Sequence, residues 1–469
     1  MHRYSTQSSI KSDENFQYSL PTGRQEFSMF NFQVKTRSKV CLLPIAYCLF
    51  LASCSVQKQI SRSAQKVIND SSMLAAHVGI SIFEPAAGKY WYNYQGDKYF
   101  VPASNTKIPT CYAAMKNLGD SLRSLDYLET DTVLFIRPAA DPSFLHRDFY
   151  VHPAFNFLKK SNKKLAFVLP KWEAEVYGNG WAWNDYNDAY MAERSEMPIY
   201  GNVVEYSLQQ GNKKYELKGD IDFFRNALNP YVDPITPDIR IRRRRVDNTF
   251  DVFYNKGSFT KIQIPFRTFE NQRLLEDTLK KAWLDNVYPP TDSRYKSIYS
   301  LPTDTLLRIM MHRSDNFFAE QVLLMLSNEK LGVMNDEKII DTLLKTDFKD
   351  LPQKPRWADG SGLSRYNLFT PQDFVFILNK MNNEFGMDRI KVIFPTGGEG
   401  TLSNYYKADS NFFFAKTGTL SAVVALSGYL FTKKNKLLIF SVLVNNHQAS
   451  ATTVRRNVEK FLQEIRSKY

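Results

Sequence analysis

Near residue 80, the pattern of apolar and polar positions predicts a pair of strands followed by a helix. Residues 78–83 are a short apolar run, and a turn at residues 85–88 separates them from a second predicted strand, residues 89–93. From Ser104 to about residue 119, apolar residues recur at steps of three and four, which predicts a helix with one buried stripe. We expect Cys111, which lies on this stripe, to pack in the core.

After this helix the pattern changes to short strands separated by turn-rich loops. Strands are predicted at residues 132–137, 165–169 and 203–208. This texture continues to about residue 268 and is typical of a separate, strand-rich unit. The length of the chain, 469 residues, also favours more than one structural unit.

Helical periodicity then returns. Helices are predicted at residues 270–286, 303–313 and 317–326. Near the end, two apolar stretches, residues 412–430 and 436–444, flank a lysine-rich turn, which predicts a hairpin deep in a sheet. Residues 450–468 have the pattern of an amphipathic helix.

The order of these elements predicts one domain interrupted by another. A strand pair, a helix, a long insert, further helices, a strand hairpin and a terminal helix follow one another along the chain. We therefore expect an α+β fold in which residues 54–120 and 269–469 form a mainly antiparallel sheet flanked by helices. In this prediction, residues 121–268 are a strand-rich inserted domain.

Residues 29–54 have the pattern of a bacterial export signal. An uncharged, mostly apolar stretch, residues 40–53, follows three basic residues, which are Lys35, Arg37 and Lys39. The stretch is too short to span a bilayer, which takes about 20 helical residues, but it fits the apolar region of a signal peptide. It ends in Leu51-Ala52-Ser53-Cys54, which resembles a bacterial lipobox, in which the cysteine sulfur receives diacylglycerol.

We interpret residues 1–53 as an upstream segment followed by a lipoprotein signal peptide. Met29 is a better start than Met1, because signal peptides begin close to their positive charges. Ser55, directly after the expected lipidation site at Cys54, is not the acidic residue associated with retention in the inner membrane. We expect a periplasmic protein, lipid-anchored to the inner leaflet of the outer membrane. The alternative is a plain secretory signal that contains a chance cysteine.

The net charge of +13 raises the question of a nucleic-acid partner. The densest basic run is residues 240–245, but no nucleic-acid-binding module surrounds it. A solvated strand face or an interdomain contact explains the run better, so we expect no nucleic-acid partner.

Cysteine and histidine usage bears on disulfides and metals. Three of the four cysteines lie in or beside the N-terminal apolar segment, so Cys111 has no intrachain partner in the body of the protein. The six histidines are scattered, with no HExxH motif and no pairing with cysteine. We expect no metal site and no cofactor.

Ser104-Asn105-Thr106-Lys107 is an SxxK motif at the start of a predicted helix. The same pattern also occurs at residues 55–58, 63–66 and 258–261, so the motif alone is weak. At a helix start, however, a serine and a lysine one turn later share a face. A buried lysine with a lowered pKa can then take the proton of the hydroxyl, and the helix N-terminus favours the developing negative charge.

Two further short motifs follow in the chain. Ser314-Asp315-Asn316 lies in the turn between two predicted helices, where the serine can relay a proton and the asparagine can hold a substrate amide. Lys416-Thr417-Gly418-Thr419 begins a predicted strand, where the glycine lets a substrate backbone lie close and the hydroxyls can hold a carboxylate. Taken singly, each motif is also a common helix cap, turn or strand start. Their ordered set resembles the signature of penicillin-binding proteins and serine β-lactamases.

Within that superfamily, the chain resembles the S13 family of DD-peptidases, the penicillin-binding protein 4 type of D-alanyl-D-alanine carboxypeptidase and endopeptidase. The resemblance runs from about residue 74 to the C-terminus and includes strings at residues 359–365, 180–185 and 400–402. It implies a DD-peptidase/β-lactamase-like domain, and S13 proteins fill the long gap between Ser104 and Ser314 with an inserted domain. Two positions depart from the family pattern: the turn at residues 139–142, and Ser421 after the KTG motif.

The resemblance implies acyl transfer to Ser104, with Lys107 as general base. The backbone N–H groups of Ser104 and Thr419 would then form the oxyanion hole. Ser314 and Lys416 would pass a proton to the leaving amine, and β-lactams would acylate Ser104 as covalent inhibitors.

The resemblance also implies a substrate site for peptidoglycan peptides. Thr417 and Thr419 would bind the terminal carboxylate, beside Gly418. Asp185, from the insert, would contact the amine of a diamino acid on the stem peptide. Tyr190 and Arg365 match neighbouring positions of that pocket.

Two other functions stay open at this point. A β-lactamase is one, although the Glu-x-x-Leu-Asn string of class A enzymes is absent between Asn316 and Lys416. A catalytically inactive, wall-binding lipoprotein is the other, although the motif set is intact. The choice between carboxypeptidase and endopeptidase activity also stays open.

Overall fold

The computed structural model describes residues 58–210, 215–232, 239–254, 261–290 and 294–469. All of these belong to Cys54–Tyr469, the second of the two units into which the chain divides. The expected signal peptide, with Met29 and Cys54, lies outside the described residues. Within the described ranges, no helix is both long and apolar enough to cross a membrane.

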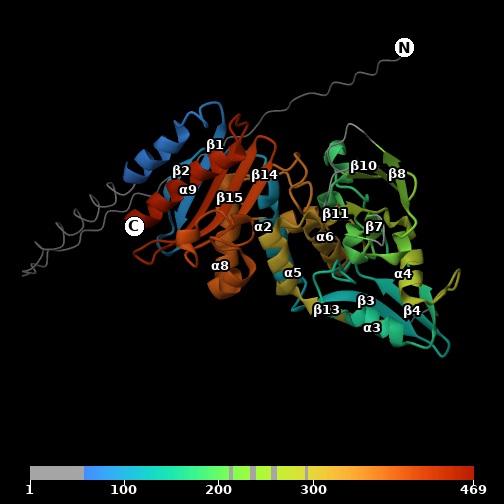
Figure 1. The fold of residues 1–469 in the computed structure, drawn as a ribbon. Coiled ribbons are helices and arrows are strands. Elements are labelled where there is room, and N and C mark those ends of the chain that lie inside the picture. Colours follow the sequence, from blue (N-terminus) through green and yellow to red (C-terminus); the bar gives the residue numbers. More distant parts are fainter. Residues whose placement is uncertain (1–57, 211–214, 233–238, 255–260, 291–293) are drawn as a thin grey trace, which may run out of the picture. The chain divides into compact units, whose positions relative to one another are not determined.

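The main sheet has five antiparallel strands in the order β14-β15-β16-β1-β2 (Figure 1). The strands are β1 (His77–Glu84), β2 (Lys89–Tyr94), β14 (Phe413–Leu420), β15 (Val423–Phe431) and β16 (Leu437–Asn445). Pairing of β1 with β16 joins an early and a late segment of the described residues. Strand β14 lies at an edge of the sheet, so one side of its backbone is free for other contacts.

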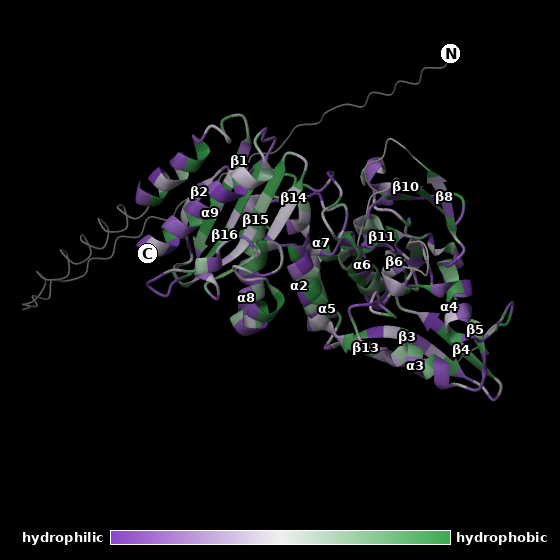
Figure 2. Cartoon of the chain, viewed as in Figure 1, coloured by the Kyte–Doolittle hydropathy of each residue, from purple (hydrophilic) through white to green (hydrophobic). Residues whose placement is uncertain are grey.

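Helices cover both faces of this sheet, which explains its composition. On one face, α9 (Ala451–Lys468) packs with helical residues 58–68 in a common apolar cluster. The other face is covered by α8 (Pro371–Ile393), and α2 (Lys107–Asn117), α5 (Thr303–Ile309) and α6 (Asn316–Leu331) belong to the same apolar cluster. Because both faces are buried, β15 is apolar along most of its length instead of alternating (Figure 2).

The region between α2 and α5 is rich in strands. A mixed five-stranded sheet has the order β12-β5-β4-β3-β13, and two three-stranded sheets have the orders β8-β10-β9 and β11-β6-β7. Their bounds are β3 (Ser121–Glu129), β4 (Val133–Pro138), β5 (Lys164–Phe167), β6 (Val203–Gln210), β7 (Tyr215–Gly219), β8 (Leu228–Val232), β9 (Arg240–Arg243), β10 (Phe250–Tyr254), β11 (Lys261–Pro265), β12 (Trp283–Leu284) and β13 (Lys296–Pro302). Helices α3 (Pro153–Lys160) and α4 (Asn271–Leu279) contribute to a third apolar cluster here.

The predicted fold class is confirmed, because an antiparallel sheet flanked by helices coexists with several further sheets. The strand-rich region continues past residue 268, where the prediction placed its end. Helix α4 and strand β12 share its apolar cluster, and β13 pairs with β3. We therefore describe this region as extending to Pro302.

Two predicted elements differ from the structure. The helix expected at residues 270–286 is wrong in its second half. Helix α4 ends at Leu279, Lys280 takes a left-handed conformation (φ 54°), and the chain then pairs with β5. The apolar stretch expected as one strand of a hairpin contains both β14 and β15, with a turn at which Ala422 has φ 60°. Tertiary pairing, which local periodicity does not report, decides both cases.

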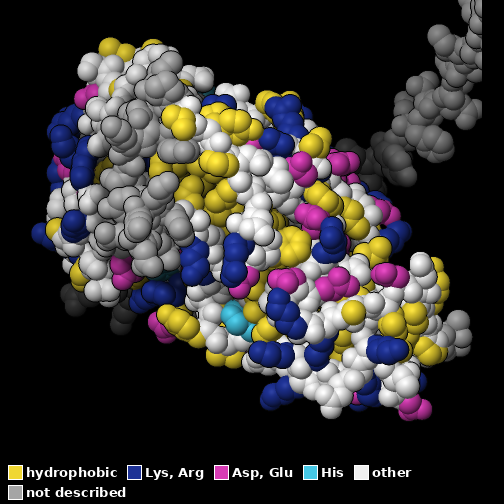
Figure 3. Space-filling view, turned by 45° about the vertical axis from the view of Figure 1, so that its right-hand side comes forward, with side chains coloured by type: hydrophobic (Ala, Val, Ile, Leu, Met, Phe, Trp, Pro, Cys, Tyr) yellow, Lys and Arg dark blue, Asp and Glu magenta, His cyan; other side chains and the backbone are white. Residues whose placement is uncertain are grey.

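The basic run at residues 240–245 begins as a strand. In β9, Arg240 and Arg242 are exposed and Arg243 is buried, with its guanidinium 3.8 Å from the centre of the Tyr186 ring. On the face drawn in Figure 3, Lys and Arg side chains are interspersed with Asp and Glu. Residues 240–243 of the run thus form a strand that exposes two arginines to solvent and packs a third inward.

Helix α9 stabilises the main sheet through its buried face. We expect Leu462→Ala, which removes a side chain that is 1% exposed, to lower the free energy of unfolding by about 2–5 kcal/mol. Lys460→Ala, on the exposed face of the same helix, should change it by no more than about 0.5 kcal/mol. Urea denaturation of both variants is the measurement, and equal losses would contradict the packing described here.

Candidate active site

Ser104 lies in a tight turn that leads directly into helix α2. The turn is a 3₁₀ helix, Ala103–Thr106, and Ala103 has φ 47°, in the left-handed region. Lys107 is the first residue of α2 and is fully buried, whereas Ser104 is half-buried. The turn thus exposes the hydroxyl and places the lysine beneath it.

Lys107 Nζ has three contacts. It lies 3.1 Å from Ser104 Oγ, 2.7 Å from Asn316 Oδ1 and 2.7 Å from the Ser361 carbonyl oxygen. A neutral amine has two N–H donors and one lone pair. Asn316 Oδ1 and the Ser361 carbonyl oxygen can only accept hydrogen bonds, so they take the two N–H groups. When Lys107 is neutral, its lone pair therefore faces the Ser104 hydroxyl.

Burial favours the neutral form of Lys107. It lowers the pKa of this amine to about 8, against the opposing charges of Asp359, Asp315 and Glu320. About a tenth of Lys107 is therefore unprotonated at pH 7, far more than for a lysine with the usual pKa, which suits a general base.

Ser314 and Asn316 flank the start of helix α6. A π-helical turn, Met310–Ser314, follows α5, and Ser314 has φ 62°. Asp315 then caps α6 by accepting a hydrogen bond from the Phe318 N–H at 2.9 Å. This sharp reversal turns Asn316 toward Lys107, while Ser314 Oγ accepts a hydrogen bond from Lys416 Nζ at 2.7 Å.

Lys416 is fully buried on the edge strand β14. Burial holds the pKa of its amine well below the usual value, and the positive charges of Lys107 and Arg455 lower it further. Besides Ser314, its Nζ contacts the carbonyl of Thr417 at 2.7 Å. Two buried lysines thus face the two serines predicted for the chemistry, one lysine to each serine.

The outer edge of β14 is open only where the KTG motif lies. Farther down the strand, the Ala415 N–H donates to the Pro395 carbonyl at 3.1 Å, so Ala415 points its backbone outward. Because backbone direction alternates along a strand, Thr417 and Thr419 also point their backbone groups outward. This edge can pair with an extended peptide.

Gly418 lies against the backbone of the turn that carries Ser104. A Cβ at this position would lie 2.7 Å from the Pro102 carbonyl oxygen and 3.1 Å from the Ser104 nitrogen. The glycine therefore permits close packing of β14 on the turn. The side chain of Asn105 strengthens the same junction, 2.7 Å from Ser427 Oγ on β15.

The predicted carboxylate-binding hydroxyls have partners. Thr417 Oγ1 donates to Thr401 Oγ1 at 2.7 Å. This contact places residues 400–402, one of the strings noted in the sequence, beside the KTG motif. Thr419 is exposed, and its Oγ1 accepts from the guanidinium of Arg455 on α9. Sequence reasoning missed Arg455, because one basic residue on an amphipathic helix carries no signal of its own.

The three predicted pocket residues lie on two segments of the chain, Asp185 and Tyr190 on one and Arg365 on the other. Asp185 is half-buried in a 3₁₀ turn, Trp183–Asn187, and Tyr190 is 46% exposed just beyond it. Partial burial raises the pKa of the Tyr190 phenol, and the carboxylates of Asp188 and Asp185 add to this effect. Tyr190 reaches the catalytic motifs through its carbonyl, 3.4 Å from Asn316 Nδ2. Arg365 is exposed and donates to the Ser421 carbonyl at 2.7 Å, beside the end of β14.

A cavity of about 350 Å³ adjoins Ser314 and Asn316. Tyr190, Arg147 and Asp148, all from the strand-rich region, form part of its wall. Its volume falls within the range of small-ligand sites. The cavity therefore leads from Ser314 and Asn316 toward the strand-rich region, and Ser104 and Lys416 do not line it.

The sequence profile of the D-Ala-D-Ala carboxypeptidase 3 (S13) family matches residues 60–236 and 257–467. The chain belongs to this family. It is thus a serine-type D-Ala-D-Ala carboxypeptidase, a penicillin-binding hydrolase of peptidoglycan peptides, as the motif order predicted.

Individual relatives agree with this assignment. The chain is 22% identical to the D-alanyl-D-alanine carboxypeptidase DacB of Haemophilus influenzae over 416 residues, which cover 76% of this chain and 82% of that protein. The fold is similar to the crystal structure of penicillin binding protein 4 (dacB) from Haemophilus influenzae, with TM-score 0.69 and 19% identity over 87% of this chain and 98% of that chain. A complex of that protein with a β-lactam gives TM-score 0.65 at 18% identity, with the same coverage.

The contact of Gly418 with the nucleophile turn can be tested. In Gly418→Ala, the new Cβ pushes β14 away from Ser104, and we expect labelling by a fluorescent penicillin to slow on the order of a hundredfold. Gly332→Ala at the end of α6 is the matched control, because no atom lies within 4 Å of a Cβ there and only its positive φ is strained. The control should lose some stability and keep its labelling rate; a Gly418→Ala variant that labels at the wild-type rate would refute this role.

Proposed function

We propose that the chain hydrolyses D-alanyl bonds of peptidoglycan stem peptides through an acyl-enzyme on Ser104. The observation that carries the proposal is the contact of Lys107 Nζ with Ser104 Oγ, while Asn316 and Ser361 occupy the two N–H donors of the amine. This arrangement supports Lys107 as the base that activates the nucleophile.

In the first step, Ser104 Oγ bonds to the carbonyl carbon of the penultimate D-alanine, and its proton goes to Lys107. The backbone N–H groups of Ser104 and Thr419 stabilise the oxyanion. The outward direction of the Thr419 backbone on β14 supports this role. Loss of one such donor typically costs on the order of a hundredfold in rate.

In the second step, the bond between the carbonyl carbon and the leaving amine breaks. The Ser314 hydroxyl gives the amine its proton and takes one from the ammonium form of Lys416, 2.7 Å away, a form that the nearby substrate carboxylate favours. Lys107 then releases its proton to solvent, and Lys416 regains one. Water attacks the ester on Ser104 while Lys107 takes its proton, and Lys107 gives that proton to the Ser104 oxygen as the ester bond breaks and the peptide is released.

The carboxylate next to the leaving amine binds beyond Gly418. Thr417 and Thr419 supply hydroxyls, and Arg455, in contact with Thr419, supplies positive charge. A bound carboxylate would also favour the ammonium form of the buried Lys416. In a terminal D-alanine, the leaving amine and a carboxylate are on the same carbon. The same holds for a cross-link formed through the amine at the D-centre of a diamino acid. The same subsite therefore serves carboxypeptidase and endopeptidase substrates.

The third residue of the stem peptide extends toward the strand-rich region. The proximity of Asp185 to Tyr190, and of the Tyr190 carbonyl to Asn316, supports a subsite in which Asp185 binds the side-chain amine of a diamino acid. Arg365, at the far end of β14, completes this subsite.

Purified muropeptides analysed by mass test the proposal. Wild-type protein should release D-alanine, or cut cross-links, and Ser104→Ala should do neither, because no acyl-enzyme can form. Lys116→Ala on the same helix, at a partly exposed position, is the control for folding and should keep full activity. Rapid hydrolysis of nitrocefin without action on muropeptides would favour a β-lactamase, and folded protein that takes up no labelled penicillin would favour a wall-binding module.

We further propose that Cys54 carries a lipid anchor and that the protein faces the periplasm from the inner leaflet of the outer membrane. The lipobox-like string Leu51-Ala52-Ser53-Cys54 and the basic residues before the apolar stretch support a lipoprotein signal peptide. Lipoprotein processing supplies more than one acyl chain, which stable anchoring requires.

Membrane fractionation tests the anchor. Wild-type protein should pellet with outer membranes, and Cys54→Ala should move to the soluble periplasmic fraction, because it has no thiol to acylate. Cys48→Ala, in the apolar stretch, is the matched control and should leave fractionation unchanged. A Cys54→Ala variant that stays fully bound to membranes would overturn the proposal.

A further inference from the structure

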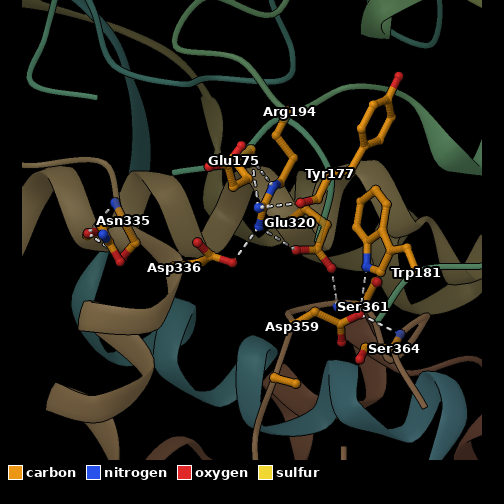
Figure 4. Close-up of polar contacts among 12 residues, drawn as sticks. Glu175, Tyr177, Trp181, Arg194, Glu320, Asn335, Asp336, Asp359, Ser361 and Ser364 are labelled. Atoms are coloured by element: carbon orange, nitrogen blue, oxygen red, sulfur yellow. Dashed lines mark hydrogen bonds and ion pairs between the residues drawn. The ribbon is translucent and has the colours of Figure 1, made fainter. Parts of the chain in front are cut away.

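A buried cluster of charged side chains lies behind the loop that contacts Lys107 (Figure 4). At its centre is Arg194, from the strand-rich region, which is 1% exposed. Its Nη1 lies 2.6 Å from Asp336 Oδ2 and 3.5 Å from Glu320 Oε2. Its Nε and Nη2 donate to the Glu175 carbonyl at 3.0 and 2.7 Å. The guanidinium therefore joins the strand-rich region to two carboxylates on other elements.

Glu320 links this cluster to the catalytic helix. It is fully buried on α6, four residues after Asn316, so the two side chains lie on one face of the helix, a turn apart. One oxygen, Oε2, faces Arg194, and the other, Oε1, accepts a hydrogen bond from the Ser361 N–H at 2.8 Å. Figure 4 shows the carboxyl group between Arg194 and Ser361.

Ser361 completes a path to the base, since its carbonyl accepts from Lys107 Nζ at 2.7 Å. The loop around it has little freedom. Asp359 accepts from the Gly362, Ser364 and Trp181 N–H groups at 2.8, 2.6 and 2.9 Å. A Cβ on Gly362 would lie 1.9 Å from the Ala103 carbonyl oxygen, directly before the nucleophile. A shift of this loop would therefore move both the base and the nucleophile.

We propose that Arg194 and Glu320 are positioning residues for Lys107. Arg194 holds Glu320, Glu320 holds the Ser361 N–H, and the Ser361 carbonyl occupies one N–H of the Lys107 amine, so that its lone pair faces Ser104. Through this path, the strand-rich region supports the general base. The inference rests on the proposed function, because it assumes that Lys107 activates Ser104.

The charges around the path decide how it responds to pH. Lys107 faces Asp315 and Glu320 on α6, Asp359 on the loop, and Lys416 on β14. Glu320 faces Arg194, Asp336 and Asp359, and burial together with Asp359 raises its pKa to about 7, against the positive charge of Arg194. Acylation requires neutral Lys107, so its rate rises with pH through the pKa of this amine. Removal of the negative charge of Glu320 lowers that pKa and moves the rise to lower pH.

Glu320→Gln removes the negative charge of the side chain and keeps an oxygen that can hold the Ser361 N–H in position. The amide oxygen can still accept from the Ser361 N–H, so we expect acylation by a fluorescent penicillin to reach a plateau within about threefold of wild type. Relative to that plateau, the rate at about pH 7.5 should rise roughly twofold or more, because most of Glu320 is ionised there in the wild type and Lys107 loses a facing negative charge in the variant.

Glu320→Ala removes the acceptor as well. The Ser361 carbonyl is then no longer held, and we expect the plateau to fall on the order of tenfold to a hundredfold, through the acylation rate and not through penicillin binding. Arg194→Met should also lower the plateau, and Arg194→Lys, which restores the charge, should recover part of it.

Asp373→Asn is the matched control. Asp373 is also a fully buried carboxylate, with a pKa raised to about 6 by burial, but it caps α8 and has no contact with the path. It should lose stability and keep the wild-type pH profile, with rates normalised to the folded fraction measured by circular dichroism. Should Glu320→Ala fail to fold, the profile of the isosteric Glu320→Gln decides.

Two results would overturn the inference: Glu320→Gln with the wild-type profile, or Asp373→Asn with the same shift as Glu320→Gln. Failure of the proposed function is recognised separately. In that case folded wild-type protein takes up no labelled penicillin, whereas a failed positioning role leaves the wild type reactive and the Glu320 variants unchanged.

Discussion

Burial of Lys107 is the constraint on which the rest of the site depends. Burial lowers the pKa of the amine to about 8, and the same burial requires acceptors for its N–H groups, since an unpaired polar group inside a protein is costly. The acceptors come from Asn316 and Ser361, which lie far from Lys107 in the chain and far from each other. Helix α6 and the loop at residues 359–364 must therefore both be in place before the Lys107 amine can face Ser104 Oγ.

The sequence predicted those parts of the site that depend on local geometry. Ser104 and Lys107 are one helical turn apart, and Ser314 and Asn316 flank a single helix cap, so a short motif contains each pair. The structure brings these two motifs together with Lys416, because β14 is the edge strand beside the turn of Ser104. The fold class was predictable for a similar reason, since periodicity marks strands and helices that are buried on one or both faces.

Contacts made by single residues at long range were not predictable. The carbonyl of Ser361 has no signature, because every residue has one. Arg455 resembles any basic residue on an amphipathic helix. Arg194 is 1% exposed, but arginine is almost never fully buried, so its residue type predicts an exposed side chain. The second half of the predicted helix at residues 270–286 failed for the same reason: pairing of β12 with β5 decides its structure, and that partner lies more than a hundred residues earlier.

The distribution of buried charge shows that the strand-rich region contributes to the structure around Lys107. Two lysines, Lys107 and Lys416, are fully buried in the site. The pKa of each amine is lowered, and the neutral form avoids the free-energy cost of burying a charge. Glu320 is equally buried, but it gains from staying ionised only while Arg194 faces it. Glu320 and Asp336, which follow the strand-rich region in the chain, supply the carboxylates, and the strand-rich region supplies the guanidinium. The electrostatic balance behind the base is thus shared between the two regions, and neither one contains all of it.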